Sequence, residues 1–341
     1  MVENDGNGDK PGNDTLVVVT VVYFLSAFFT TVGNLAALVV IVRTKELREV
    51  TRIFMANLAI TDLLVGILIL PFVLSTALTD HWGFGYVWCQ FTGFCNLLLC
   101  SMSALSLTAV SCERFMVIVH PLRYVTLLTF RRSVFAIIFI WVYAALGASV
   151  PLFGIGRYAY FQERLTCGLD YESNLVFTVL VTLLYFALPV SWVFYIYFHI
   201  FKTARRHARS VHALVIGLPG HNVGFSVKER KATSTIFLII GVYLATWTPF
   251  TVVQLVSMSI SDVEIPREID TVTTCLLFLN SACNPWIYCG MNSVFRQGLR
   301  RQMRLLLGCC CSRCAFTGSG SQNPSSPSTI QTQNAENQSV A

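Results

Sequence analysis

Seven long apolar stretches alternate with short polar segments along the chain. A stretch of about 20 apolar residues is long enough to cross the ~30 Å hydrocarbon core of a bilayer as an α-helix. Every connection is short, so no separate soluble domain fits between the stretches. The predicted spans are Leu16–Val42, Ile53–Leu78, Phe84–Val119, Val134–Phe153, Val176–Phe201, Ser234–Ser257 and Ile269–Tyr288.

A shorter amphipathic pattern follows the seventh span. Its apolar residues recur at helical spacing and its arginines fill the opposite face, which is typical of a helix that lies on a membrane surface. The apolar residues are Val294, Phe295, Leu299, Met303 and Leu306, and the arginines are Arg296, Arg300, Arg301 and Arg304. The pattern as a whole predicts an all-α membrane protein, with a seven-helix bundle over residues 16–290 and a short eighth helix over residues 291–308.

The composition agrees with a membrane protein, because 54% of the 341 residues are hydrophobic and only 12% are charged. Soluble domains carry roughly 25% charged residues. Most of the 24 Lys and Arg residues fall in alternate connections, which places these connections in the cytoplasm. The N-terminal tail, residues 1–15, is then extracellular and residues 309–341 form a cytoplasmic tail. The net charge of +6 therefore reports topology, and we predict no nucleic-acid partner.

Covalent features are predicted on both sides of this topology. Asn13 begins an Asn-Asp-Thr tripeptide, which is an N-glycosylation pattern on the outer face. Cys89 and Cys167 are the two cysteines expected outside, where an oxidising compartment favours a disulfide between them. The cluster Cys309, Cys310 and Cys311 follows the amphipathic helix and is a candidate for palmitoylation, with unmodified thiols as the alternative.

Several polar residues occur inside the predicted spans, where each one needs a partner or a role. Asp62 is the one acid well inside a span, and it can meet amides and hydroxyls of other helices if the helices pack in sequence order. These groups are Asn34, Ser103, Asn280, Ser281 and Asn284. The cluster is a candidate site for a small cation. A protonated Asp62 that only accepts and donates hydrogen bonds is the alternative.

Short motifs occur in order, one for each expected helix. They are Asn34, "NLAITDLL" with Asp62, the Cys89 and Cys167 pair, "CERF" followed by "HPL", Trp141, Pro189 with Tyr197, "TWTP" and "NPWIY". With these motifs the chain resembles a rhodopsin-like, class A G-protein-coupled receptor over about residues 16–308. Its helices are similar to those of amine receptors, without the aspartate that binds the amine.

The resemblance implies a switch at the cytoplasmic end. Glu113 and Arg114 stand in the family's acidic-Arg-Tyr triplet, with Phe115 in the third place. The acid and a second one at the inner end of the sixth helix, here Glu229, would hold the arginine at rest. On activation the sixth helix would swing outward, and the arginine would turn toward Tyr197 and Tyr288. The "NPWIY" motif contributes Asn284 and Pro285.

The resemblance also implies an allosteric sodium site and the partners of the family. The sodium residues would be Asp62, Ser103, Asn280, Ser281 and Asn284, with no other cofactor. The implied partners are a heterotrimeric G protein, with arrestin and receptor kinases acting on the cytoplasmic tail, besides membrane lipids. The implied location is the plasma membrane.

The ligand pocket is predicted to lie between the outer halves of the helices. Asn96 replaces the aspartate with which amine receptors bind an ammonium group, and residues 269–288 contain no lysine for retinal. The expected lining is neutral and partly aromatic: Asn96, Leu97, Cys100, Tyr185, Trp247, Phe250, Thr251, Gln254, Thr274 and Phe278. We therefore expect an orphan-type receptor with a neutral or lipid-like ligand, or one that signals with little need of a ligand.

Two other classes of protein fit the sequence less well. A seven-span transporter or channel would use Asp62 as an ion-relay group, but we find no further acids along a pathway. A membrane enzyme lacks support, because the six histidines show no metal-binding spacing and no G-x-S-x-G elbow occurs. The sequence thus favours a receptor that is not an enzyme.

Overall fold

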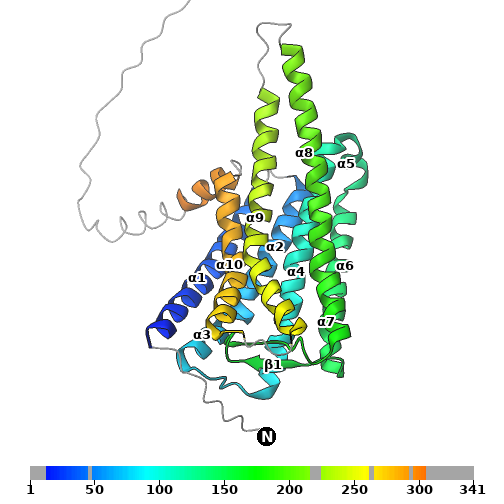
Figure 1. Cartoon of the computed structure of the whole chain (residues 1–341). Coiled ribbons are helices and arrows are strands. Elements are labelled where there is room, and N and C mark those ends of the chain that lie inside the picture. Colours follow the sequence, from blue (N-terminus) through cyan, green and yellow to red (C-terminus); the bar gives the residue numbers. More distant parts are fainter. Residues whose placement is uncertain (1–12, 45–47, 216–223, 261–264, 292–294, 305–341) are drawn as a thin grey trace, which may run out of the picture. The chain divides into compact units, whose positions relative to one another are not determined.

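The computed structural model describes residues 13–44, 48–215, 224–260, 265–291 and 295–304. The chain divides into two units, Met1–Arg300 and Arg301–Ala341, and the architecture below belongs to the first. The described part is mainly helical (Figure 1), which confirms the predicted fold class. Its helices are α1 Asn13–Arg43, α2 Glu49–Leu68, α3 Leu70–Thr79, α4 Gly85–Val119, α5 Pro121–Leu127, α6 Phe130–Ser149, α7 Leu175–Thr182, α8 Leu188–Val215, α9 Gly224–Ser259 and α10 Arg267–Met291.

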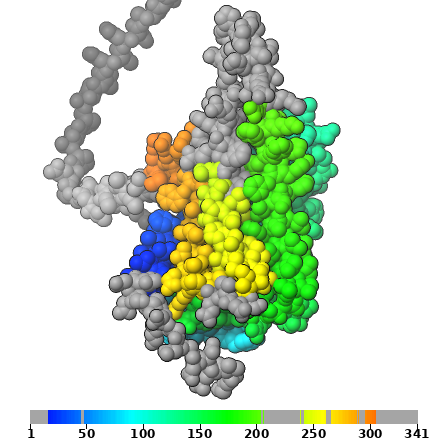
Figure 2. Space-filling model, in the orientation of Figure 1, coloured from blue at the N-terminus to red at the C-terminus, as the bar shows by residue number. Residues whose placement is uncertain are grey.

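Five spans of the described residues are long and apolar enough to cross a membrane. They are Leu16–Arg43, Glu49–Thr79, Gly85–Val119, Phe130–Phe153 and Leu175–Thr203. The remaining two predicted spans correspond to α9 and α10, which pack against each other. Figure 2 shows α10 between α1 and α9, and contacts of α10 with both helices agree with this view.

Burial differs strongly among the helices and shows which one is central. The most apolar window of α4 is 56% buried, whereas those of α1 and α6 are each 17% buried. The exposed side chains of α1 and α6 are largely aliphatic or aromatic, as expected for surfaces in contact with lipid. Helix α4 therefore lies inside the bundle and contacts α2, α6 and α8.

Two proline residues lie at interruptions of the helices, and a third lies inside a continuous helix. Helix α2 ends at Leu68, and Pro71 lies in the first turn of α3. Pro189 follows η2, a π-helical turn over Leu183–Ala187, and Pro249 lies inside α9. Proline has no N–H to donate and its ring clashes with the preceding turn, so these are points where a helix bends.

A β-hairpin covers the outer end of the bundle, which the sequence analysis did not predict. Strand β1 (Tyr158–Phe161) pairs antiparallel with β2 (Thr166–Leu169). The predicted disulfide is confirmed, because Cys167 in β2 is bonded to Cys89 in the first turns of α4. The Tyr158 hydroxyl also donates a 2.6 Å hydrogen bond to the carbonyl of Ala148. The hairpin is thus fixed to the outer ends of both α4 and α6.

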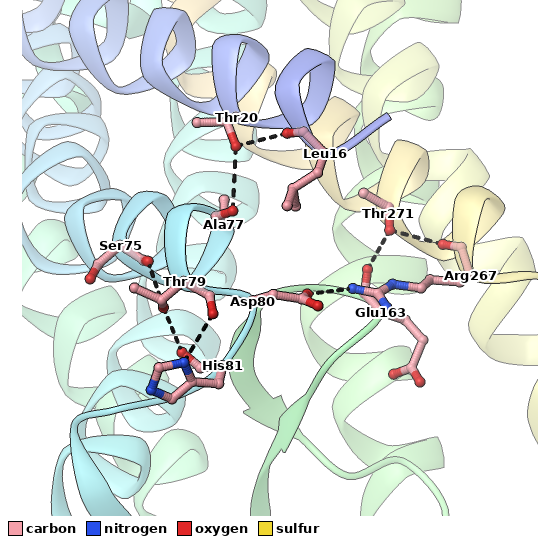
Figure 3. Close-up of polar contacts among 10 residues, drawn as sticks. All are labelled: Leu16, Thr20, Ser75, Ala77, Thr79, Asp80, His81, Glu163, Arg267 and Thr271. Carbon is pink, nitrogen blue, oxygen red and sulfur yellow. Dashed lines mark hydrogen bonds and ion pairs between the residues drawn. The ribbon is translucent and has the colours of Figure 1, made fainter. Parts of the chain in front are cut away.

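Contacts at the outer rim tie the hairpin turn and α3 to α10 (Figure 3). Arg267 Nη2 lies 2.9 Å from Asp80 Oδ1, so the start of α10 is paired with the end of α3. The Thr271 hydroxyl donates to the backbone carbonyl of Glu163 in the hairpin turn. The outer ends of the helices are therefore connected through the loop that lies over them.

Candidate functional site

The inner end of α4 carries a buried acid next to a partly exposed base. Arg114 Nε lies 3.2 Å from Glu113 Oε2, and the side chains are 24% and 1% exposed, respectively. Glu113 Oε1 also accepts a 2.7 Å hydrogen bond from the Thr51 hydroxyl and a 3.3 Å hydrogen bond from the Tyr124 hydroxyl. Burial raises the pKa of Tyr124, and Glu113 raises it further, so this phenol stays protonated and can donate. Three donors therefore satisfy the buried carboxylate.

The structure describes the side chains of only some of the other residues predicted for the switch. Tyr197 is buried and its hydroxyl donates a 3.3 Å hydrogen bond to Ser111 of α4. Pro285 lies inside α10, and a Cβ atom on Gly33 of α1 would lie 3.1 Å from its ring. Gly33 thus permits a close approach of α1 to the proline. The side chains of Glu229 and Tyr288 lie outside the described part of the structure.

The polar residues predicted to meet in mid-membrane do lie together. Asp62 is fully buried, and its Oδ2 accepts a 2.7 Å hydrogen bond from Asn284 Nδ2. Asn280 Nδ2 lies 3.5 Å from the Ser103 hydroxyl. Asn34, also fully buried, donates a 3.0 Å hydrogen bond to the backbone carbonyl of Ser281. Asn284 of α10 therefore bonds to the carboxylate of α2, and α10 also contacts polar side chains of α1 and α4.

One carboxylate oxygen of Asp62 does not accept a hydrogen bond from a described residue. Among the residues that the structure describes, Asp62 Oδ1 has no hydrogen-bond partner, although it is buried. A buried carboxylate oxygen without a donor is costly, unless a cation or a proton satisfies it. Oxygen ligands from a carboxylate, hydroxyls and amides suit a hard cation such as sodium. The residues present therefore fit the cation site expected from the sequence.

A second polar connection lies beside this cluster and joins three helices. Asn57 of α2 donates a 2.7 Å hydrogen bond to the Ser106 hydroxyl of α4. The indole N–H of Trp141 in α6 donates a 2.9 Å hydrogen bond to Asn57 Oδ1. No role was predicted for Asn57, because only the packing shows that its amide contacts both Ser106 and Trp141.

Trp247 lies on α9, two positions before Pro249. Its ring stacks on Tyr243 at 5.3 Å between centroids and on Phe186 at 6.1 Å. The indole Nε1 is buried and has no partner among the described residues. Trp247 thus lies between the outer cavity, which it lines, and the inner half of the bundle, to which Tyr243 belongs.

An outer cavity of about 950 Å³, including its open mouth, lies between the helices below the hairpin. All ten residues predicted for the ligand pocket line this cavity. They come from α4, η2, α9 and α10. That these residues bind a ligand stays a prediction.

Asn96 occupies the position where amine receptors have their aspartate, and its side chain forms two hydrogen bonds within the protein. Its Nδ2 donates a 3.4 Å hydrogen bond to the carbonyl of Cys167, and its Oδ1 accepts from the thiol of Cys100 at 3.3 Å. Residues 96 and 100 lie on one face of α4, since side chains four residues apart on a helix are neighbours.

The hairpin adds cavity residues that the sequence analysis missed, and the most important one is Arg164. Its Nε lies 2.8 Å from Asp270 Oδ2, and its Nη2 donates a 2.8 Å hydrogen bond to Gln254 Oε1. Its guanidinium carbon lies 4.3 Å from the centre of the Phe161 ring. No periodicity marks a loop residue, and Asp270 is 106 positions away in the sequence, so the contact could not be inferred from the chain alone.

Two phenols of the outer loop are partly buried. Burial raises the pKa of Tyr171, which lines the cavity, to about 12. Burial likewise raises the pKa of Tyr160 to about 12, with a further contribution from Asp80. Both side chains are therefore neutral near pH 7.

Several predicted modification sites fall outside the part of the chain that the structure places. The cluster Cys309, Cys310 and Cys311 lies outside the described residues. Helix α1 begins at Asn13, within the predicted tail, but the side chain of Asn13 is not described. The amphipathic helix is described over residues 295–304, where Phe295 is buried and Met303 is exposed. Glycosylation and palmitoylation stay predictions.

Known proteins were compared with this chain as a whole. It is 28% identical to G-protein coupled receptor 161 of Danio rerio over 87% of its own length and 61% of the relative, so it spans less than two thirds of that protein. It is 30% identical to the histamine H2 receptor of Canis lupus familiaris, covering 84% of this chain and 80% of the relative.

The fold and the family are supported by two further comparisons. The crystal structure of squid rhodopsin superposes with a TM-score of 0.77 at 22% identity, covering 89% of each chain, which supports the fold alone. The family model of the 7 transmembrane receptor (rhodopsin family) matches residues 33–288, which hold the polar cluster, the cavity and the Glu113 and Arg114 pair. The chain therefore belongs to the rhodopsin family of seven-transmembrane receptors.

Proposed function

We propose that the protein is a plasma-membrane receptor that passes a signal from the outer cavity to a heterotrimeric G protein at the inner end of the bundle. Its N-terminus is extracellular and its C-terminus cytoplasmic, as the charge distribution indicates. The observation that carries the proposal is the placement of both ends of the pathway on one helix. Asn96 and Cys100 of α4 line the outer cavity, and Glu113 and Arg114 of the same helix form the inner ion pair.

The inner pair supplies the switch. Glu113 is enclosed by Thr51 and Tyr124, whereas the guanidinium of Arg114 is partly exposed. Arginine presents a planar set of donors, so it can exchange one set of acceptors for another when the bundle opens. Outward movement of the inner end of α9 would uncover Arg114 for a G protein. A bias of a few kcal/mol between the two states is enough for such a switch.

Sodium fits the polar cluster as an allosteric ligand. The oxygen atoms of Asp62, Ser103 and Asn280 would be its ligands, with Ser281 and Asn284 as the remaining residues of the site. Asn284 bonds to Asp62, and Asn280 lies next to Ser103. A bound cation would supply a positive charge for Asp62 Oδ1, which has no described donor. The chain's own part is to hold the carboxylate at this position through Asn284.

We also propose arrestin and receptor kinases as partners, because the chain belongs to the rhodopsin family of receptors. Membrane lipids surround the exposed apolar faces of α1 and α6.

The relatives include receptors named for histamine, but Asn96 stands where such amine receptors have their aspartate. An apolar, lipid-like or aromatic ligand body suits the cavity walls, and signalling with little ligand is the second mode that we propose.

The experiment that tests the function measures G-protein activation in cells that express the full chain without an added ligand. A panel of G-protein chimeras with cAMP, calcium and inositol phosphate readouts identifies the coupled pathway. Arg114→Ala should abolish the response at unchanged surface expression, because the guanidinium is the group that meets the G protein. Arg123→Ala, in the neighbouring helix α5, is the matched control and should retain most of the response. A response that survives in Arg114→Ala would contradict the proposal.

The alternative function is an ion-coupled transporter or channel that uses Asp62. Such a protein would carry ions across the membrane, and its flux would depend on Asp62 but not on Arg114. Flux that persists in Arg114→Ala and is lost in Asp62→Asn would favour this alternative. Among the described residues, no carboxylate lines the outer cavity, so the structure provides no second acid for a relay there.

A further inference from the structure

The electrostatic character of the outer cavity is set by one side chain. Among the described residues that line it, Arg164 is the single charged group, and no Asp or Glu is present. The remaining lining is neutral and largely apolar, and it includes Trp247, Phe250 and Phe278. The sequence had predicted a neutral pocket, because Arg164 belongs to the hairpin turn and not to a span.

Arg164 is held in a fixed orientation. Asp270 and Gln254 engage its Nε and Nη2, and its guanidinium plane lies against Phe161. Gln254 in turn donates a 3.4 Å hydrogen bond from Nε2 to Asp270 Oδ1. The next residue, Leu165, is buried with a φ of 55°, so the turn itself is anchored. A guanidinium that is oriented before a ligand arrives loses little side-chain entropy on binding.

The ion pair presents its positive end to the cavity. Arg164 lines the cavity, whereas Asp270 does not. Both side chains are largely shielded from water, with 12% and 9% exposure, so charge is screened less here than at the surface. A guanidinium has five N–H donors, and the contacts to Asp270 and Gln254 engage two of its nitrogens. A ligand anion can therefore add charge-assisted hydrogen bonds without displacing Asp270.

We propose that the outer cavity binds an organic acid, a carboxylate on an apolar or aromatic body, with Arg164 as its counter-ion. The carboxylate lies against the guanidinium below the hairpin, and the apolar body extends toward Phe278 and Trp247. Asp270 and Gln254 are positioning residues that hold Arg164. The inference deepens the proposed receptor function by naming its ligand class, and its tests use no G protein, so the two can fail separately.

The first test measures whether the cavity favours anionic or cationic reagents, and it does not require that the ligand be known. Cys100 lines the cavity and has a free thiol. Its thiolate attacks the sulfur of a methanethiosulfonate reagent, a mixed disulfide forms and methanesulfinate leaves. The purified full-length receptor is treated with the anionic sulfonatoethyl or the cationic trimethylammonioethyl reagent. Modification of Cys100 is followed by peptide mass spectrometry, and each rate is divided by that of mercaptoethanol with the same reagent.

The wild type should favour the anionic reagent, on the order of fivefold, because the positive end of the ion pair faces the cavity and raises the local concentration of small anions. Arg164→Gln keeps a similar size without the charge and should remove the preference. Arg157→Gln is the matched control, since Arg157 is an exposed arginine of the same loop that pairs with Asp170 outside the cavity. Cys100→Ser verifies the peptide assignment.

Arg164→Gln leaves the carboxylate of Asp270 without its arginine, which could prevent folding. The double variant Arg164→Gln, Asp270→Asn removes both charges and keeps polar groups of the same size. It should also lose the preference for the anionic reagent. A wild-type preference for the cationic reagent, or a preference for the anionic reagent that survives in the variants, would overturn the inference.

The second test measures binding of stated probes by the melting temperature of the purified receptor. Decanoate and indoleacetate are compared with their methyl esters and with decylamine and tryptamine. The acids should raise the melting temperature of the wild type and of Arg157→Gln, and not that of Arg164→Gln, Asp270→Asn. Equal stabilisation by esters, stabilisation by the amines alone, or no effect of either acid would contradict the assignment of an acidic ligand.

Discussion

The Thr51 hydroxyl of α2 donates a 2.7 Å hydrogen bond to Glu113 Oε1, on the carboxylate whose other oxygen lies 3.2 Å from Arg114 Nε. The acid is therefore shared between a fixed partner on another helix and a partly exposed partner that can leave. Breaking a buried pair by removing one member is costly, because it leaves the other charge without compensation. This arrangement favours the resting state, in which Arg114 stays paired with Glu113.

Glu113→Gln should raise ligand-free G-protein activation several-fold. The amide has a similar size but no charge, so the ion pair that retains Arg114 becomes a weaker hydrogen bond. Thr51→Ser is the matched control, because it keeps the hydroxyl that bonds to Glu113, and its basal signal should stay close to that of the wild type. The measurement is cAMP or calcium per receptor at the cell surface. A basal signal in Glu113→Gln that persists after Arg114→Ala is added would show that the acid acts elsewhere.

Asp62→Asn should remove the effect of sodium on receptor stability. At a sodium concentration about tenfold above the dissociation constant, binding stabilises the folded state by roughly 1.4 kcal/mol. The melting temperature of the wild type in sodium chloride should thus exceed that in choline chloride at equal ionic strength. The asparagine variant should melt at the same temperature in both salts. Indifference of the wild type to the choice of cation would refute the sodium site.

The disulfide predicts equal effects of its two cysteines. Cys89→Ser and Cys167→Ser should each reduce surface delivery several-fold, because either change removes the covalent link between the hairpin and α4. The double variant should be no worse than either single variant, since the same bond is lost. Cys275→Ser, at a buried free cysteine, is a control that removes a thiol and no disulfide. Unequal single effects, or additive effects in the double variant, would be inconsistent with one shared bond.

Gly147 of α6 is predicted to be intolerant of a side chain. A Cβ atom there would meet the Tyr185 hydroxyl, which donates a 2.9 Å hydrogen bond to the carbonyl of Tyr143. Gly147→Ala must move this phenol and should lower stability by about 1–3 kcal/mol, the usual cost of overpacking. Tyr185→Ala removes the obstructing ring, so the added cost of Gly147→Ala should largely vanish in that background. Additive losses of melting temperature would show that the two residues do not collide.

The Gly147 pair also illustrates what tertiary structure contributes to the cavity. Tyr185 was predicted to line the pocket from its place in the fifth span, and it does so. That its hydroxyl passes into the space left by a glycine of α6 depends on how the two helices pack. Spacing within each span does not determine this packing.

The sequence by itself determined the spans, the disulfide and the meeting of Asp62 with Asn284, and its resemblance to the receptor family supplied the ten residues around the outer cavity. The spans and the contact of Asp62 follow from a local rule, because a bilayer requires long apolar helices and makes each polar group within them seek a partner. Only the tertiary structure decided where the outer loop lies. The hairpin places Arg164 against Asp270 and Gln254, and α2 places Thr51 against Glu113. Such contacts join residues far apart in the sequence, and a loop outside the membrane has no periodicity from which its position could be inferred.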